Sequence, residues 1–160
     1  MELVEEIRDR LTELDPCLEL DPSNDKNLIG YAERFGCHFL PLYEGVNTFF
    51  ESDPEKAESK ANEISSTPVF PMPQMNDGII GYVTFEDKAA LLYDKEKYLN
   101  KLAKEYEECG MEIDEEFESY YSNALDWFCY NDLGYGSSQY ITPAFACTDE
   151  FDLIRTQKLI

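Results

Sequence analysis

Residues 79–93 read IIGYVTF-EDK-AALLY, and this stretch carries the clearest indication of the fold class. Two apolar runs, 79–85 and 89–93, are separated by the polar residues 86–88. Short apolar runs rich in β-branched and aromatic residues, bounded by a turn, predict two joined strands. A helix is expected to follow over residues 95–109, because Asp94 is a suitable N-cap and Gly110 a suitable stop.

The flanking sequence alternates between helix and strand patterns. Leucine and valine spacing predicts an opening helix that Pro16 ends, and a second helix is expected to start at Asn24 or Asp25 and to end at Gly36. Ser52 is a candidate N-cap for a helix that runs to Ile64. Further expected elements are a strand over 39–43, placed at an edge by its proline, a helix starting at Asp114, and a short edge strand over 140–145.

These elements predict a single-domain α+β fold over residues 1–160, with helices packed on a small, mainly antiparallel sheet. A length of 160 residues is sufficient for one hydrophobic core. The Ser/Pro-rich stretch 65–75 also allows a two-part organisation, 1–64 and 76–160. An internal echo links residues 24–44 to residues 76–94, and it fits either a duplicated unit or chance similarity, since the first copy is predicted helical and the second extended.

Charge is the most informative feature for function. The chain carries a net charge of −21, spread evenly over its two halves. Residues 105–154 contain 13 acidic residues and no Lys or Arg, together with 11 of the 22 aromatic residues. A surface of this kind repels nucleic acid and anionic membranes and attracts basic proteins.

Recognisable catalytic motifs are missing from the sequence. His38 is the only histidine, and its neighbour Cys37 would point to the opposite face of a strand. The five cysteines are widely spaced, which gives no zinc-binding pattern and favours reduced thiols in a cytosol. We therefore expect no cofactor, no bound metal, no membrane span and a cytoplasmic location.

Two readings of the acidic region remain open. As a binding surface, it would use carboxylates that are helical neighbours about 5–6 Å apart, close to the spacing of successive phosphates on a nucleic-acid strand. In the second reading the protein is a small enzyme that holds Mg²⁺ through carboxylates near the start of the helix expected at Asp114. A structural or dimerisation module is a third option. The residues expected to contact a partner are Glu105, Glu108, Glu112, Asp114, Glu115 and Glu118.

The C-terminal half also carries a recurring set of short motifs. They are Tyr93-Asp94, Gly110-Met111, the segment 128–134 with its Tyr-Asn-x-x-Gly, and Thr142-Pro143. With the lead-in 28–43, this pattern resembles small uncharacterised acidic proteins of bacterial viruses and mobile elements. Longer segments before Tyr93 and after Met111 depart from it.

This resemblance implies a viral or mobile-element origin and carries no activity with it. It favours a non-catalytic inhibitor that imitates a polyanion in the cytoplasm of a host cell. The expected partner is a basic host protein, such as a nuclease, a restriction enzyme or a CRISPR-type effector. Direct contact with nucleic acid is not expected, and a homo-oligomer is compatible with the sequence.

Overall fold

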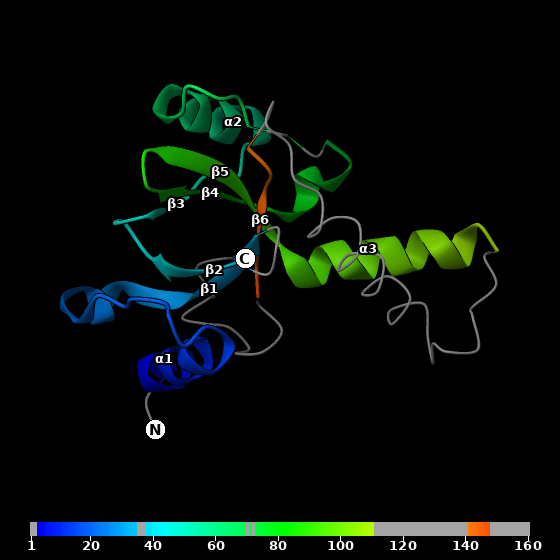
Figure 1. Ribbon diagram of the computed structural model, residues 1–160. Helices are drawn as coiled ribbons and strands as arrows, with labels where there is room; N and C mark the ends of the chain where they lie inside the picture. Colours follow the sequence, from blue (N-terminus) through cyan, green and yellow to red (C-terminus); the bar gives the residue numbers. More distant parts are fainter. Residues whose placement is uncertain (1–2, 35–37, 70, 72, 111–140, 148–160) are drawn as a thin grey trace.

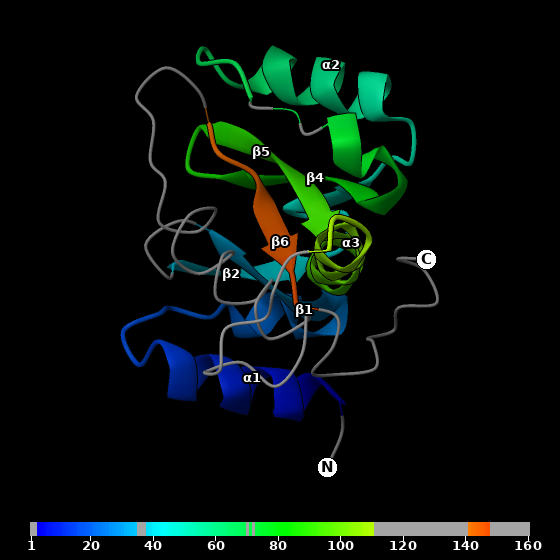
Figure 2. The same cartoon turned by 90° about the vertical axis from the view of Figure 1, so that its right-hand side faces the viewer.

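The protein has a mixed α/β architecture built on a curled six-stranded sheet (Figures 1 and 2). A computed structural model describes residues 3–34, 38–69, 71, 73–110 and 141–147. The helices are α1 (Leu3–Leu14), α2 (Pro54–Ile64) and α3 (Lys95–Glu108), with 3₁₀ helices η1 (Pro22–Asn27) and η3 (Pro73–Gly78). The strands are β1 (Leu28–Arg34), β2 (His38–Tyr43), β3 (Thr48–Phe50), β4 (Ile79–Phe85), β5 (Lys88–Asp94) and β6 (Ala144–Ala146).

The strand order is β2-β1-β6-β5-β4-β3. Strand β6 pairs antiparallel with β1 and parallel with β5, so the sheet is mixed and not mainly antiparallel as expected. The parallel pair arises because the chain leaves β5 through α3 and returns along β5 in the same direction. An isolated parallel bridge between Glu44 and Thr48 joins the ends of β2 and β3, which brings the two end strands of the order together.

The two halves of the sheet repeat the same local structure. Each half contains a 3₁₀ helix followed by a two-stranded hairpin, η1-β1-β2 and η3-β4-β5. The register shifts between Leu28 and Gly30 in the first hairpin and between Ile79 and Gly81 in the second. The echo between residues 24–44 and 76–94 therefore corresponds to a structural repeat.

The third strands of this repeat are exchanged between its halves. After β2 the chain enters β3, which pairs with β4 of the second hairpin. After β5 and α3 the chain later forms β6, which pairs with β1 of the first hairpin. Ala32 and Val83 are equivalent positions of the two hairpins, each two residues after the glycine of the bulge. Ala146 of β6 lies opposite Ala32, and Thr48 of β3 lies opposite Val83, so the two exchanged strands pair in the same register. The first copy will be called repeat A (β1, β2, β3) and the second repeat B (β4, β5, β6).

The prediction of a helix over residues 24–36 is wrong. Residues 22–27 form η1, and β1 follows directly. Leu28 to Ala32 are all buried, because β1 lies between β2 and β6 and is covered on both faces. A strand buried on both faces has no polar alternation, so its apolar positions also fit a helical spacing.

Several other expectations are confirmed, two of them with changes. The structure contains the two strands of the 79–93 stretch, the opening helix, and β2 at the end of the strand order. It also contains α3, with Gly110 beyond its C-cap. The N-cap of α2 is Asp53 and not Ser52, because the Asp53 carboxylate accepts hydrogen bonds from the backbone N–H groups of Glu55 and Lys56. The strand expected at an edge over 140–145 is β6, which is central and fully buried.

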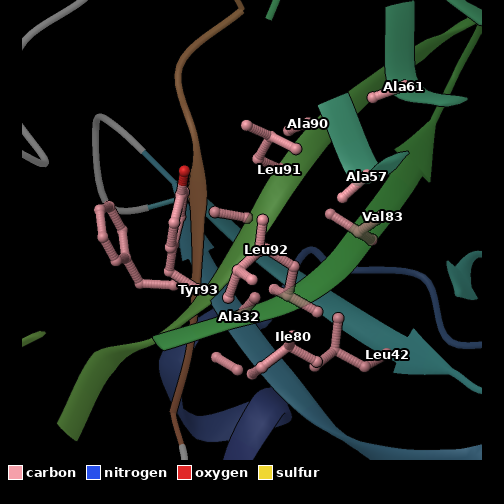
Figure 3. Close-up of a cluster of buried hydrophobic side chains, with 14 of the residues drawn as sticks. Ala32, Leu42, Ala57, Ala61, Ile80, Val83, Ala90, Leu91, Leu92 and Tyr93 are labelled. Carbon is pink, nitrogen blue, oxygen red and sulfur yellow. The ribbon is translucent and has the colours of Figure 1, made fainter. Parts of the chain in front are cut away.

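Helix α1 packs beside β1 and β2, and helix α2 packs beside β4 and β5 (Figure 2). One buried cluster joins alanines of α2, Ala57 and Ala61, to Val83 and Leu92 of repeat B and to Leu42 of repeat A (Figure 3). A second cluster packs Ile7 and Leu11 of α1 against β1. Because one cluster draws on both repeats, their hydrophobic residues are buried together.

The bulge in β4 requires glycine at position 81. A Cβ atom there would lie 1.9 Å from the carbonyl oxygen of Phe49 and 2.8 Å from the backbone nitrogen of Glu51. Both obstacles are backbone atoms of β3 and the residue after it, so no side-chain rotation relieves the clash. The exchanged strand β3 fits beside β4 only because position 81 lacks a side chain.

We predict that Gly81→Ala lowers the free energy of unfolding by about 3 kcal/mol, since the backbone of β3 must move. The measurement is urea unfolding followed by circular dichroism. Gly45→Ala is the matched control: its φ of 75° carries strain, but nothing lies within 4 Å of the added Cβ, so a loss of only about 1 kcal/mol is expected. Equal losses in the two variants would show that close approach of β3 is not what restricts position 81.

Candidate functional site

Helix α3 is anchored at its N-terminal end. The Asp94 carboxylate accepts a hydrogen bond from the backbone N–H of Lys97 at 3.1 Å, which caps the helix. Tyr98 and Leu99 are buried, and the Tyr98 ring lies 5.4 Å from the ring of Phe145 in β6. The first turns of α3 are thereby fixed against strands β5 and β6.

The last turn of α3 carries three exposed carboxylates and no basic residue, and we call this set the acidic arm: Glu105, Glu107 and Glu108. Figure 1 shows α3 running away from the sheet, with this end far from α1 and α2. Lys104, one turn earlier on the same helix, places its Nζ 4.0 Å from Glu108 Oε1. Both side chains are mostly exposed, at 75% and 65%, so this pair contributes less than about 1 kcal/mol and neutralises little.

Carboxylates in this position oppose helix stability. The C-terminal end of a helix carries partial negative charge, so an acid in the last turn costs roughly 0.3–1 kcal/mol and a base would stabilise by a similar amount. The acidic arm places three acids there and no compensating base within the turn. Helix formation therefore does not explain this choice of residues.

Of the six residues expected to contact a partner, the structure describes two. Glu105 and Glu108 lie in the acidic arm, three positions apart and hence neighbours on the helix surface. Glu112, Asp114, Glu115 and Glu118 lie outside the described residues. Glu107, which was not among the expected contact residues, is also exposed.

Within the described residues, no group of three or more His, Cys, Asp or Glu side chains could hold a metal ion. The carboxylates expected to hold Mg²⁺ in a small enzyme, which lie between residues 112 and 118, are outside the described residues. Among the described helices, none is both long and apolar enough to cross a membrane.

The structure brings together a second polar group that sequence reasoning missed. Glu33 of β1 accepts two contacts at its Oε1 atom, from Lys95 Nζ at 3.1 Å and from the thiol of Cys147 at 3.4 Å. The side chains of Lys95 and Glu33 are only 10% and 15% exposed, and Cys147 is 1% exposed. We call this set the junction cluster, because it lies where β1, the start of α3 and the end of β6 meet.

The junction cluster left little trace in the sequence. Glu33 fell within a segment predicted to be helical, and Lys95 looked like an ordinary first-turn residue. Cys147 directly follows an apolar run, Ala144 to Ala146, which is the one local indication that its thiol would be buried. The three residues meet only because β6 inserts between β1 and β5.

Comparison with known proteins gives no further constraint: no family model, no curated protein and no solved structure matches this chain.

We predict that Lys95→Met lowers the free energy of unfolding by about 3 kcal/mol, because it leaves the Glu33 carboxylate largely buried without its ammonium partner. Thermal and urea unfolding measure the loss. Lys101→Met is the control: Lys101 Nζ lies 3.6 Å from Asp77, whose side chain is 74% exposed, so less than about 1 kcal/mol should be lost. A Lys95 variant as stable as the Lys101 variant would contradict a structural role for the ion pair.

Proposed function

We propose that the protein binds a basic surface of another protein through carboxylates that imitate a polyanion, the acidic arm being the described part of this surface. The observation that carries the proposal is the last turn of α3, which holds three exposed acids, whereas the last turns of α1 and α2 hold one acid each. Helix stability disfavours such a concentration of acids at a C-terminal end. Residues placed against local stability are frequent at functional sites.

Two further features support a binding role. The arm lies at the far end of a helix whose first turns are packed against β5 and β6, so its carboxylates are exposed on a fixed support. The charge of −21 on 160 residues attracts cationic partners over distances up to the screening length, about 8 Å at physiological salt. A fixed array loses less conformational entropy on binding than a disordered acidic tail would.

The partner that fits this chemistry is a protein that normally holds phosphates with Lys and Arg. Carboxylates at helical spacing would occupy those side chains and exclude nucleic acid from them. In line with the resemblance of the C-terminal half, we propose that the partner is a nucleic-acid-binding defence protein of a bacterial host and that the protein inhibits it.

The test starts with the intact protein immobilised and exposed to bacterial lysate at low salt, followed by elution with increasing salt. Each eluted basic protein is purified and titrated with wild type and with Glu105→Lys/Glu108→Lys. We expect the double variant to bind at least about tenfold more weakly, because two attractive contacts become repulsive. We also expect wild type to displace duplex DNA from the purified partner.

The matched control is Glu13→Lys/Glu63→Lys. These residues lie in the last turns of α1 and α2, so the control changes net charge and helix dipoles in the same way as the test variant. Glu13 also resembles Glu108 in having a basic neighbour on its own helix, Arg10 at 3.5 Å. Equal weakening in both variants, or binding that does not depend on salt, would rule out the acidic arm as the contact surface.

A further inference from the structure

Helix α3 carries its charges in the opposite order to the one that its dipole favours. Anions stabilise the N-terminal end of a helix and cations stabilise the C-terminal end. The first turn of α3 instead contains two lysines and one glutamate, and its last turn contains the acidic arm. Of the three described α-helices, α3 alone has more bases than acids in its first turn.

Lysines also follow one another along the side of α3 that faces solvent. Lys97, Lys101 and Lys104 are four and three positions apart, so they are neighbours on the helix surface, and we call this set the basic strip. Like charges at these spacings oppose helix formation, and Lys104 precedes Glu108 in the less favourable order for an ion pair. The chain has only 13 Lys and Arg against a net charge of −21, yet three of them are gathered here. Helix stability explains neither the basic strip nor the acidic arm.

The basic strip runs into the acidic arm on the same side of α3. Glu108 continues the spacing of the strip, four positions beyond its last lysine, and Glu105 borders it. The opposite side of the helix packs on the buried cluster of Figure 3 through Leu99, Leu102 and Tyr106. At 1.5 Å per residue, the middle lysine of the strip and Glu108 are about 10 Å apart along the helix axis. The exposed side therefore changes from positive to negative within about two turns.

The active site of a metal-dependent nuclease has the complementary arrangement of charges. Carboxylates hold its Mg²⁺ ions at the phosphate that is cleaved, and Lys and Arg side chains bind neighbouring phosphates of the substrate. A nucleic-acid strand rises about 3.4 Å per nucleotide, so the sign change over about 10 Å on α3 corresponds to roughly three nucleotides. A surface that only binds phosphates is basic throughout and would repel the basic strip.

We propose that the partner is a metal-dependent nuclease and that α3 lies across its active site. This inference rests on the proposed function and specifies which class of phosphate-binding protein is bound. The acidic arm occupies the bases that bind phosphates, and the ammonium groups of the basic strip pair with the metal-binding carboxylates in place of Mg²⁺. The lysines remain available for this role, because Lys101 lies 3.6 Å from Asp77 and Lys104 lies 4.0 Å from Glu108, and such exposed pairs are weak.

The experiment uses each basic protein that the salt gradient elutes from immobilised wild type. Its cleavage of DNA and of RNA is measured with Mg²⁺ and with EDTA, and its affinity for wild type is measured in EDTA and in Ca²⁺. We expect cleavage that requires Mg²⁺ and is inhibited by wild type. We also expect binding at least about tenfold tighter in EDTA than in Ca²⁺, because the lysines and the metal exclude each other from one site.

The contribution of the lysines is measured with Lys97→Gln/Lys104→Gln. This variant should bind at least about tenfold more weakly in EDTA and show a smaller effect of Ca²⁺. Lys56→Gln/Lys88→Gln is the matched control, because it removes two exposed lysines elsewhere and changes the net charge equally. Its affinity and its Ca²⁺ dependence should equal those of wild type.

A further variant reverses the order of charges without changing their sum. Lys97→Glu/Lys104→Glu/Glu105→Lys/Glu108→Lys keeps the net charge at −21 and places acids first and bases last, as the helix dipole favours. We expect a melting temperature no lower than that of wild type and an affinity at least about a hundredfold weaker. Native affinity in this variant would show that the order of charges does not matter and would overturn the inference.

The outcomes separate this inference from the proposed function. A partner that requires the acidic arm but lacks metal-dependent nuclease activity, or binds equally without the lysines, overturns the inference and leaves the proposed function intact. If no protein is retained on the immobilised wild type, the proposed function fails and the inference fails with it.

Discussion

The exchange of third strands between two bulged hairpins is the constraint on which the rest of the structure depends. Strand β3 leaves repeat A to pair with β4, and β6 leaves repeat B to pair with β1. The first exchange requires Gly81, whose missing side chain leaves room for the backbone of Phe49. The second brings Cys147 beside Glu33 and gives Tyr98 of α3 the ring of Phe145 to pack against. Both candidate sites thus follow from one arrangement of strands.

Local patterns predicted the elements whose partners lie nearby in the sequence. Residues 79–93 form the expected strands because strand composition, turn and register are all encoded within fifteen residues. Residues 28–34 were assigned wrongly because β1 is buried on both faces, and continuous apolar character is compatible with helix and strand alike. Its partner β6 lies more than a hundred residues away, so nothing local revealed that both edges of β1 would be paired.

The two candidate sites differ in the same way. The carboxylates of the acidic arm follow one another on a helix whose cap and stop could be recognised, so their exposure on one turn was predictable. The junction cluster joins side chains separated by 62 and 114 positions, and its geometry depends on the placement of β6. What the sequence did contain was the echo between the two halves, which corresponds to the matching register shifts of the two hairpins.

The central position of β6 has a consequence for the emergence of the protein from the ribosome. Its three residues lie between β1 and β5 in the sheet. Strand β1, the first of the described strands to be synthesised, therefore cannot complete its pairing until β6, the last of them, has been made. Until residue 146 has left the exit tunnel, both of those neighbours present unsatisfied backbone amides and carbonyls, which are sites for mispairing with other chains. Contacts between such distant positions also form slowly. Newly made chains should therefore depend on chaperones that shield strand edges more than the modest size of the protein would suggest.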